Sequence, residues 1–471
     1  MHQDKEKTAS QHQRILHLTW PTLIGQIAVI AYGVADTMMT ARYSAADLAA
    51  LAVGSSIYIS IFLGLSGILQ ALTPQIAHAF GAREGEKIGH LAHQGIWLAL
   101  ALALLGAIAL CFPYPLLALA KAGPEMQAKV LQYLRTLAPA LPATLAFVVY
   151  SAINNGSAQP RMVMVLQVFG LLLKIVLNAG FIYGMAGLPA LGGPGCALAT
   201  MIVAWVNLAL AWWLLKQKRA YRSYRLFGRA WEKPHWPTLR SLLALGLPIG
   251  ASYFIEVSSF TFMAIFISRL GESAVGAHQI MANIGAIIFM WPLSVAHATS
   301  TLVAQARGAG MLPQALAITR HGLQLGIGGA FIFGLACWLL RDSLLGLYTH
   351  DPQVVQRALP LFLFLAAYQI FDATQCIIAF VLRAWNVVFW PMLANAFALW
   401  GMGLLVGCIL GLNLLDLSLS PAISGVQGFW LANSLSLVWL ALLLYPYLRF
   451  IEKRAMRADG NSNHLAAVEA R

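Results

Sequence analysis

Charged side chains are scarce in this sequence. Of its 471 residues, only 10% are Asp, Glu, Lys or Arg, whereas 59% are hydrophobic. Soluble domains carry about 25% charged residues, because their surfaces face water. So few charges cannot cover a water-soluble protein of this length. The composition therefore excludes a soluble globular fold, and lipid has to cover most of the molecule.

Cysteine patterns and enzyme motifs are also lacking. The five cysteines are odd in number, lie in apolar runs and form no CxxC pair, as expected of small buried hydrophobic residues: Cys111, Cys196, Cys337, Cys376 and Cys408. The sequence contains no HExxH motif, no GxSxG motif and no phosphate-binding glycine loop. We therefore expect neither an enzyme nor a bound cofactor.

Long apolar runs dominate what is present. A membrane core of about 30 Å needs roughly 20 apolar residues per helix, and these runs lack the alternation of a β-barrel. The sequence predicts an all-α polytopic membrane protein with about twelve transmembrane helices, at 15–40, 46–72, 91–114, 129–152, 162–185, 195–216, 240–268, 275–304, 314–340, 355–382, 390–411 and 422–448.

The basic residues indicate how the chain is oriented. With the N-terminus inside, 22 of the 30 Lys and Arg residues fall on the inner side, seven fall outside and Lys174 lies within a helix. This bias predicts a multi-pass membrane protein with both termini cytoplasmic. The densest basic run, within 216–240, is expected to lie on anionic headgroups rather than to bind nucleic acid.

The two halves of the chain are related by an internal repeat. At an offset of 227 residues, Pro21 corresponds to Pro248, and Ile76-Ala-His-Ala-Phe-Gly-Ala82 to Val303-Ala-Gln-Ala-Arg-Gly-Ala309. Two six-helix lobes suit alternating access through a central cavity. The expected domains are a tail (1–14), an N-lobe (15–216), a basic linker (217–239), a C-lobe (240–450) and a second tail (451–471).

Three acids lie inside apolar segments, namely Asp36, Glu256 and Asp372. A carboxylate at bilayer depth costs several kcal/mol unless it is protonated, paired or hydrated. We interpret the three as cavity-lining groups that bind a cation or a proton. Tyr32 and Tyr368 each precede an acid by four residues, so hydroxyl and carboxyl share a helix face.

Further polar residues accompany these acids within the apolar segments: Asn178, Thr200, Gln279 and Lys174. Phe289 adds an aromatic surface. Lys174 could neutralise a carboxylate, or its stem could extend toward an interface; the sequence leaves both alternatives open.

These residues occur in motifs that resemble the multidrug and toxic compound extrusion (MATE) family, in particular its NorM branch. The resemblance extends over about 15–450 and is carried by Val34-Ala-Asp-Thr-Met-Met39, Ser252-Tyr-Phe-Ile-Glu-Val257, Phe371-Asp-Ala-Thr-Gln-Cys376 with Leu382-Arg383, Leu177-Asn178 with Tyr183-Gly184, and Leu188-Pro-Ala-Leu-Gly-Gly193 with Ala199-Thr200.

The resemblance implies a V-shaped pair of lobes that exports cationic drugs and dyes in exchange for Na⁺ or H⁺. It implies cation coupling at Glu256 and Asp372, which could bind Na⁺, with further coupling residues at Tyr368, Asp36, Tyr32, Asn178 and Thr200. It places Gln279, Phe289 and Asp351 along the drug path. Some relatives have a second acid one turn after the asparagine, where this chain has Ile182.

Other functions remain alternatives at this stage. A major facilitator transporter should carry Asp-Arg between its second and third helices, but the loop reads Gly81-Ala-Arg-Glu-Gly-Glu-Lys87. A lipid-precursor flippase of the same superfamily would need cavity Arg or Lys residues for pyrophosphate, and a channel would not need the duplication. The expected partners are small cationic molecules, Na⁺ or H⁺ and membrane lipids, and we expect a monomer.

Overall fold

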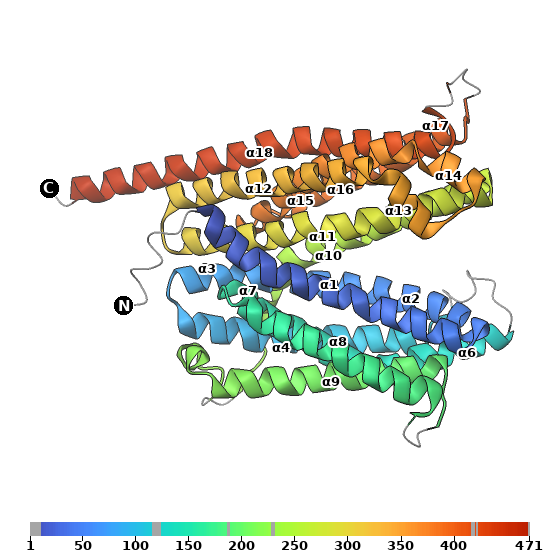
Figure 1. Ribbon diagram of the computed structural model, residues 1–471. Coiled ribbons are helices and arrows are strands. Elements are labelled where there is room, and N and C mark those ends of the chain that lie inside the picture. Colours follow the sequence, from blue (N-terminus) through green and yellow to red (C-terminus); the bar gives the residue numbers. More distant parts are fainter. Residues whose placement is uncertain are drawn as a thin grey trace. The chain divides into compact units, whose positions relative to one another are not determined.

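The fold is all-helical throughout the part of the chain that the computed structural model describes, residues 11–114, 124–185, 189–227, 231–415, 420 and 423–469 (Figure 1). Within these residues, 12 helical segments are long and apolar enough to cross a membrane. This confirms the expected polytopic fold. The polypeptide divides into two compact units: a first unit of Trp20–Phe254, and a second unit of Ile255–Arg471 together with the residues up to Thr19.

The first unit contains most of α1 and the first part of α10. Its helices are α1 (Gln11–Tyr43), α2 (Ala45–Leu69), α3 (Leu72–Gly81), α4 (Gly85–Cys111), α6 (Pro124–Leu137), η2 (Ala138–Ala140), α7 (Leu141–Gly156), α8 (Pro160–Tyr183), α9 (Gly193–Gln217), η4 (Arg219–Tyr224) and α10 (Trp236–Ile267). The part of α10 that belongs to this unit packs closely against α2. A Cβ on Gly67 of α2 would lie only 2.8 Å from the Gly250 Cα of α10. Such close glycine contacts are how membrane helices pack without a hydrophobic driving force.

The second unit contains the end of α10 and the remaining helices. These are η5 (Ser268–Leu270), α11 (Glu272–Gly308), α12 (Leu312–Leu339), α13 (Arg341–Tyr348), α14 (Pro352–Ala358), α15 (Leu361–Ala384), α16 (Phe389–Ala396), η6 (Phe397–Val406), α17 (Gly407–Gly411) and α18 (Gly425–Glu469). The sequence predicted a span from 355, but 352–358 forms the separate short helix α14 and the span begins at Leu361.

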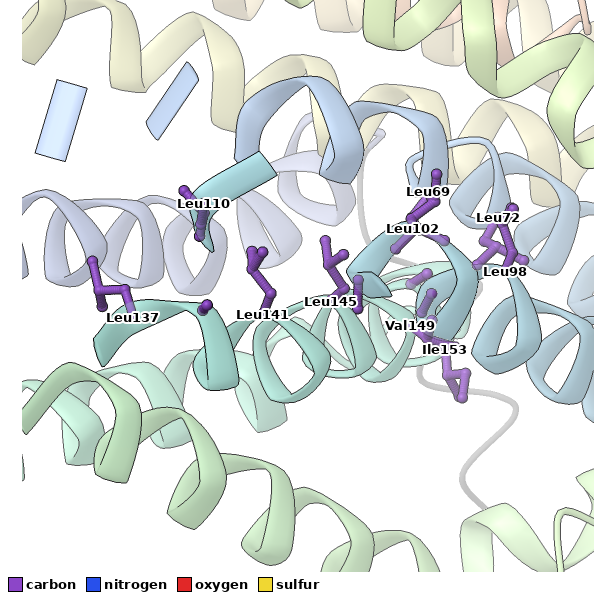
Figure 2. Close-up of a cluster of buried hydrophobic side chains, with 14 of the residues drawn as sticks. Leu69, Leu72, Leu98, Leu102, Leu110, Leu137, Leu141, Leu145, Val149 and Ile153 are labelled. Atoms are coloured by element: carbon purple, nitrogen blue, oxygen red, sulfur yellow. The ribbon is translucent and has the colours of Figure 1, made fainter. Parts of the chain in front are cut away.

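The core of the first unit is a stripe of large aliphatic side chains (Figure 2). Leu137, Leu141, Leu145, Val149 and Ile153 recur every four residues through α6, η2 and α7, so they share one face. That face packs on leucines of α2, α3 and α4, and every member is at most 6% exposed. These helices therefore form a close-packed apolar scaffold within the first unit.

A π-helix in the second unit has no counterpart in the sequence prediction. It extends over Phe397–Val406. The 227-residue offset relates it to 170–179 of α8, which is an ordinary α-helix. The related helices of the two halves therefore differ in the segment that carries Lys174 and Asn178 in α8. π-Helical segments are rare and occur mostly near functional sites.

The linker between the halves is docked rather than loose. Tyr221 and Tyr224 of η4 are 2% and 4% exposed, and their hydroxyls donate to Asn154 Oδ1 (2.7 Å) and Ser157 Oγ (2.9 Å). Burial raises the pKa of Tyr221 to about 12, which keeps its hydroxyl a hydrogen-bond donor even in alkaline solution. The linker backbone lies against Gly89 of α4, where any side chain would collide with the Tyr224 carbonyl.

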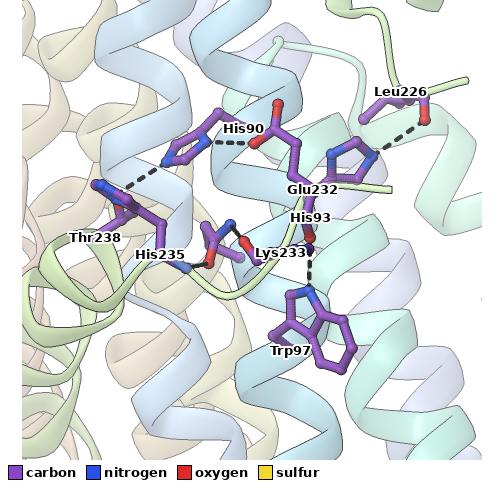
Figure 3. A network of polar contacts seen from close by, with 9 residues as sticks. His90, His93, Trp97, Leu226, Glu232, Lys233, His235 and Thr238 are labelled. Carbon is purple, nitrogen blue, oxygen red and sulfur yellow. Dashed lines mark hydrogen bonds and ion pairs between the residues drawn. The ribbon is translucent and has the colours of Figure 1, made fainter. Parts of the chain in front are cut away.

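A polar network continues this attachment along α4 (Figure 3). His90 contacts Glu232 (2.5 Å) through Nδ1 and Thr238 Oγ1 (2.9 Å) through Nε2. The Trp97 indole donates to the Glu232 carbonyl (2.9 Å), and His93 Nε2 lies 3.2 Å from the Leu226 carbonyl. The described parts of the basic linker, 217–227 and 231–239, are therefore attached to the first unit, and the expected contact with lipid headgroups stays a prediction.

We predict that Gly89→Ala weakens this attachment, because a methyl group cannot fit beside the Tyr224 carbonyl and overpacking costs about 1–3 kcal/mol. The variant should unfold at lower temperature and be cleaved faster by trypsin in the linker. Gly64→Ala is the matched control, since a Cβ at this helical glycine meets nothing within 4 Å. Equal behaviour of the two variants would contradict the packing described here.

Candidate functional site

The predicted acid of the first unit, Asp36, is neutralised by a buried lysine. Asp36 of α1 is 8% exposed and Lys174 of α8 is 2% exposed, and their Oδ2 and Nζ atoms lie 2.8 Å apart. Asn178 donates through Nδ2 to the other carboxylate oxygen (2.8 Å). Lys174 and Asn178 are four residues apart on α8 and so share the face that reaches Asp36. Of the two alternatives for Lys174, the structure shows the ion pair.

The ammonium has two further contacts. Its Nζ donates to Thr200 Oγ1 of α9 (2.6 Å), and the Thr200 hydroxyl donates to the Cys196 carbonyl (2.9 Å). The same Nζ lies 5.5 Å from the centre of the Tyr32 ring, whose hydroxyl donates to the Gln167 carbonyl (2.8 Å). The structure therefore brings together the residues predicted here, Asp36, Tyr32, Asn178 and Thr200, around Lys174.

The acids of the second unit are arranged differently. Asp372 of α15 is 5% exposed and accepts a hydrogen bond from Gln375 Nε2 (2.9 Å). Its carboxyl interacts electrostatically with that of Glu256 on α10, which also feels the charge of Arg383. Within the described part of the chain, no ion pair within 4.0 Å joins either carboxyl to a basic group. Two neighbouring carboxyls without a bonded cation repel unless a proton or an ion intervenes.

Aromatic side chains surround the second pair. Tyr368 lies one turn before Asp372, is 6% exposed and has the Asn433 side chain beside its hydroxyl. Its ring packs edge-on against Phe260 (6.4 Å between centroids) and Trp430 (5.9 Å). Trp430 in turn lies 5.9 Å from the His278 ring. Neither Asn433 nor Trp430 of α18 was predicted, because their helix carries no charge at depth that would have drawn attention to it.

The three predicted drug-path residues have separate surroundings. Gln279 and Phe289 both belong to α11; Gln279 is exposed and donates to Asn283 Oδ1 (3.2 Å), and Phe289 is half-buried. Asp351 is exposed and caps α14, where its Oδ1 accepts the Gln353 backbone N–H (2.9 Å). The structure thus gives Asp351 a capping role, and its contact with a drug stays a prediction.

Asp47 is a further buried acid, outside the three that the sequence pattern singled out. It is 8% exposed, pairs with Lys129 Nζ through Oδ1 (2.8 Å) and accepts the Gly193 N–H through Oδ2 (3.0 Å). The carboxylate therefore joins α2, α6 and the start of α9. Its position one turn after the helix-capping Ser44 is ordinary for a surface acid, so the sequence held no signal of this role.

The two acid sites are not equivalent under the internal repeat. Adding the 227-residue offset to Asp36 gives position 263, seven residues beyond Glu256 and hence about two helical turns along the related helix. In the described residues no group of three or more His, Cys, Asp or Glu side chains could hold a metal ion. A cation at Glu256 and Asp372 would thus need hydroxyl, amide or carbonyl oxygens to complete its shell.

Comparison with known proteins decides the family. The MatE family model matches the chain twice, over residues 21–179 and 248–409, and the two matches begin 227 residues apart (248 − 21), as the repeat requires.

The chain belongs to the MatE family.

Relatives and solved structures agree with this assignment. The probable multidrug resistance protein NorM of Aromatoleum aromaticum is 40% identical over 94% of each chain, and the multidrug resistance protein PmpM of Pseudomonas aeruginosa is 37% identical over 94% of this chain and 92% of its own. An outward-facing MATE transporter of the MOP superfamily shares the fold, with a TM-score of 0.86 at 19% identity over 95% of this chain and 97% of that one. This MatE chain is thus a multi-pass membrane protein with the MATE fold.

We predict that Asp47→Ala destabilises the first unit, because the buried Gly193 N–H loses its acceptor, which costs about 1–3 kcal/mol. The thermal midpoint in detergent should fall by several degrees. Glu84→Ala removes an equally short but half-exposed pair with Lys87 (2.8 Å) and should leave the midpoint nearly unchanged. A similar loss in both variants would show that burial of the Asp47 contacts is unimportant.

Proposed function

We propose that this MatE family protein exports lipophilic cationic compounds from bacteria, in exchange for a coupling cation, by alternating access. The names of its NorM and PmpM relatives support multidrug export. Exchange requires that the ion and the drug prefer opposite states or compete for one site, and such coupling is reciprocal. We assign the protein to transport rather than catalysis, in the inner membrane with both ends cytoplasmic, as the distribution of Lys and Arg supports.

The observation that carries the proposal is the Glu256–Asp372 pair. Both carboxyls belong to membrane-spanning helices, interact with each other and have no basic group in an ion pair among the described residues. Binding a cation or sharing a proton relieves their repulsion. A cationic drug would relieve it too, so ion and drug compete for the same negative charge. Competition of this kind is sufficient for antiport.

We favour Na⁺ as the coupling ion. Na⁺ is a hard cation that prefers oxygen ligands. Glu256 and Asp372 offer anionic oxygens from two helices, and Tyr368 offers a phenolic oxygen one turn away on α15. The donor set is thus oxygen-rich and fits such an ion. The same two carboxyls sharing a proton would support H⁺ exchange, which is the alternative coupling.

The surroundings of the pair favour cationic substrates. Tyr368 lies beside the two acids and packs against Phe260 and Trp430, and aromatic faces attract organic cations by about 0.5–2 kcal/mol each. A pyrophosphate-bearing lipid would instead need free positive charge. Lys174, the basic residue at depth in the first unit, is already paired with Asp36. This pairing disfavours the flippase alternative.

We predict that Glu256→Gln and Asp372→Asn each lose most dye efflux, since an amide keeps the shape but not the charge. Asp36→Asn should lose it too, because it leaves the buried Lys174 ammonium without its counter-charge. Ethidium efflux from cells at matched expression measures this. Glu272→Gln, at the exposed start of α11, is the control and should transport normally. Wild-type efflux in Glu256→Gln and Asp372→Asn would remove the basis for the proposed coupling site.

The coupling ion is tested in vesicles preloaded with a cationic dye. We expect dye release when Na⁺ is added at clamped pH, and no release from vesicles that contain Glu256→Gln. An anionic dye should stay inside under the same conditions. If release follows an imposed pH gradient and ignores Na⁺, proton exchange replaces the sodium assignment.

A further inference from the structure

The surroundings of the Lys174 ammonium have the composition of a cation-binding site. A carboxylate oxygen of Asp36 lies 2.8 Å from Nζ, a hydroxyl oxygen of Thr200 lies 2.6 Å away, and the Tyr32 ring centre is at 5.5 Å. Asn178 donates a hydrogen bond to Asp36 through its amide nitrogen, whereas its amide oxygen is buried without a hydrogen-bond partner. Anionic oxygen, neutral oxygen and a π face are the groups that bind alkali and ammonium cations.

The charge at this site is already balanced. Asp36 supplies one negative charge and Lys174 one positive charge, and both side chains are almost completely buried. One turn beyond Asn178 the chain has the fully buried Ile182, so that position adds no second acid. A metal cation entering beside Lys174 would leave a net positive charge in a low-dielectric interior, which is strongly unfavourable.

We propose that Lys174 is a tethered cation that takes the place of an exchangeable ion at Asp36. The first unit then binds no Na⁺ while the lysine is present, and the ammonium ties α1, α8 and α9 together through Asp36 and Thr200. The inference rests on the proposed function only in naming the Glu256–Asp372 pair as the site where ion exchange takes place. Lys174 acts here as a residue that determines ion selectivity.

The test uses the full-length protein with Glu256→Gln and Asp372→Asn, which removes the acids of the second unit. Radioactive Na⁺ binding and the Na⁺ dependence of the thermal midpoint are measured on this background. The background itself should bind no Na⁺. Adding Lys174→Gln should create Na⁺ binding and raise the thermal midpoint by several degrees in saturating Na⁺. Adding Asp36→Asn as well should abolish both effects.

Lys174→Arg is the control that keeps the positive charge, and it should bind no Na⁺. Asp36-dependent Na⁺ binding to the background with Lys174 intact would overturn the proposal, as would the lack of binding after Lys174→Gln. If Lys174→Gln is not recovered folded, Lys174→Ala is purified in ethylammonium, which should restore its thermal midpoint. Lack of any stabilisation by ethylammonium or Na⁺ would equally overturn it.

These outcomes are separate from those that test the proposed function. Transport by the wild-type protein that ignores Na⁺ would refute sodium coupling at Glu256 and Asp372, but it would leave the Na⁺ binding of the Lys174→Gln variant unaffected. Conversely, sodium-coupled transport could persist in the wild-type protein even if that variant bound no Na⁺.

Discussion

The cost of placing charge inside a membrane governs this structure. An ionised side chain at bilayer depth costs several kcal/mol unless something balances it. The first unit balances Asp36 from within, through the Lys174 ammonium. In the second unit, Glu256 and Asp372 interact with each other, the charge of Arg383 acts on Glu256, and no basic group among the described residues forms an ion pair within 4.0 Å of either acid. We propose that the first site is closed by its own cation and that the second binds an ion or drug from outside the protein.

The scaffold around these sites is built to hold a few polar contacts in place. A stripe of five aliphatic side chains, spaced four residues apart, packs α6 and α7 on α2, α3 and α4, and glycine contacts allow α2 and α10 to approach closely. Asp47 joins three helices of the first unit, and the linker tyrosines are buried in the same unit. Close packing and buried polar contacts thus stabilise the helix contacts, because helices in lipid lack a hydrophobic driving force for association.

Much of the fold could be predicted from the sequence. The bilayer thickness fixes the length of each membrane-spanning run, and the internal repeat indicates that the second half of the chain has the same helix order as the first. The Tyr368–Asp372 pair is likewise local, since residues four apart share a helix face. The Asp36–Lys174 pair is not local: α1 and α8 are about 140 residues apart in sequence (174 − 36 = 138), and only their contact in space decides it. The same holds for Asp47 with Lys129 and for the buried linker tyrosines.

The π-helix of Phe397–Val406 was unpredictable for another reason. Its residues form an apolar run that reads like any membrane helix, and the altered hydrogen bonding leaves no compositional trace. Gln279 and Phe289 were selected by resemblance to a family, and their role in drug binding stays a prediction. Asp36, Glu256 and Asp372, by contrast, could be identified from the sequence itself, because an ionised side chain inside an apolar segment is costly wherever it occurs.

The most direct test of this account is the binding of tetraphenylphosphonium to the purified protein by calorimetry, at rising Na⁺ and constant pH and ionic strength. If ion and drug compete for the charge of Glu256 and Asp372, Na⁺ should weaken the binding in the wild-type protein and have no such effect in Asp372→Asn. Tetraphenylphosphonium affinity that is unaffected by both Na⁺ and pH in the wild-type protein would contradict the account.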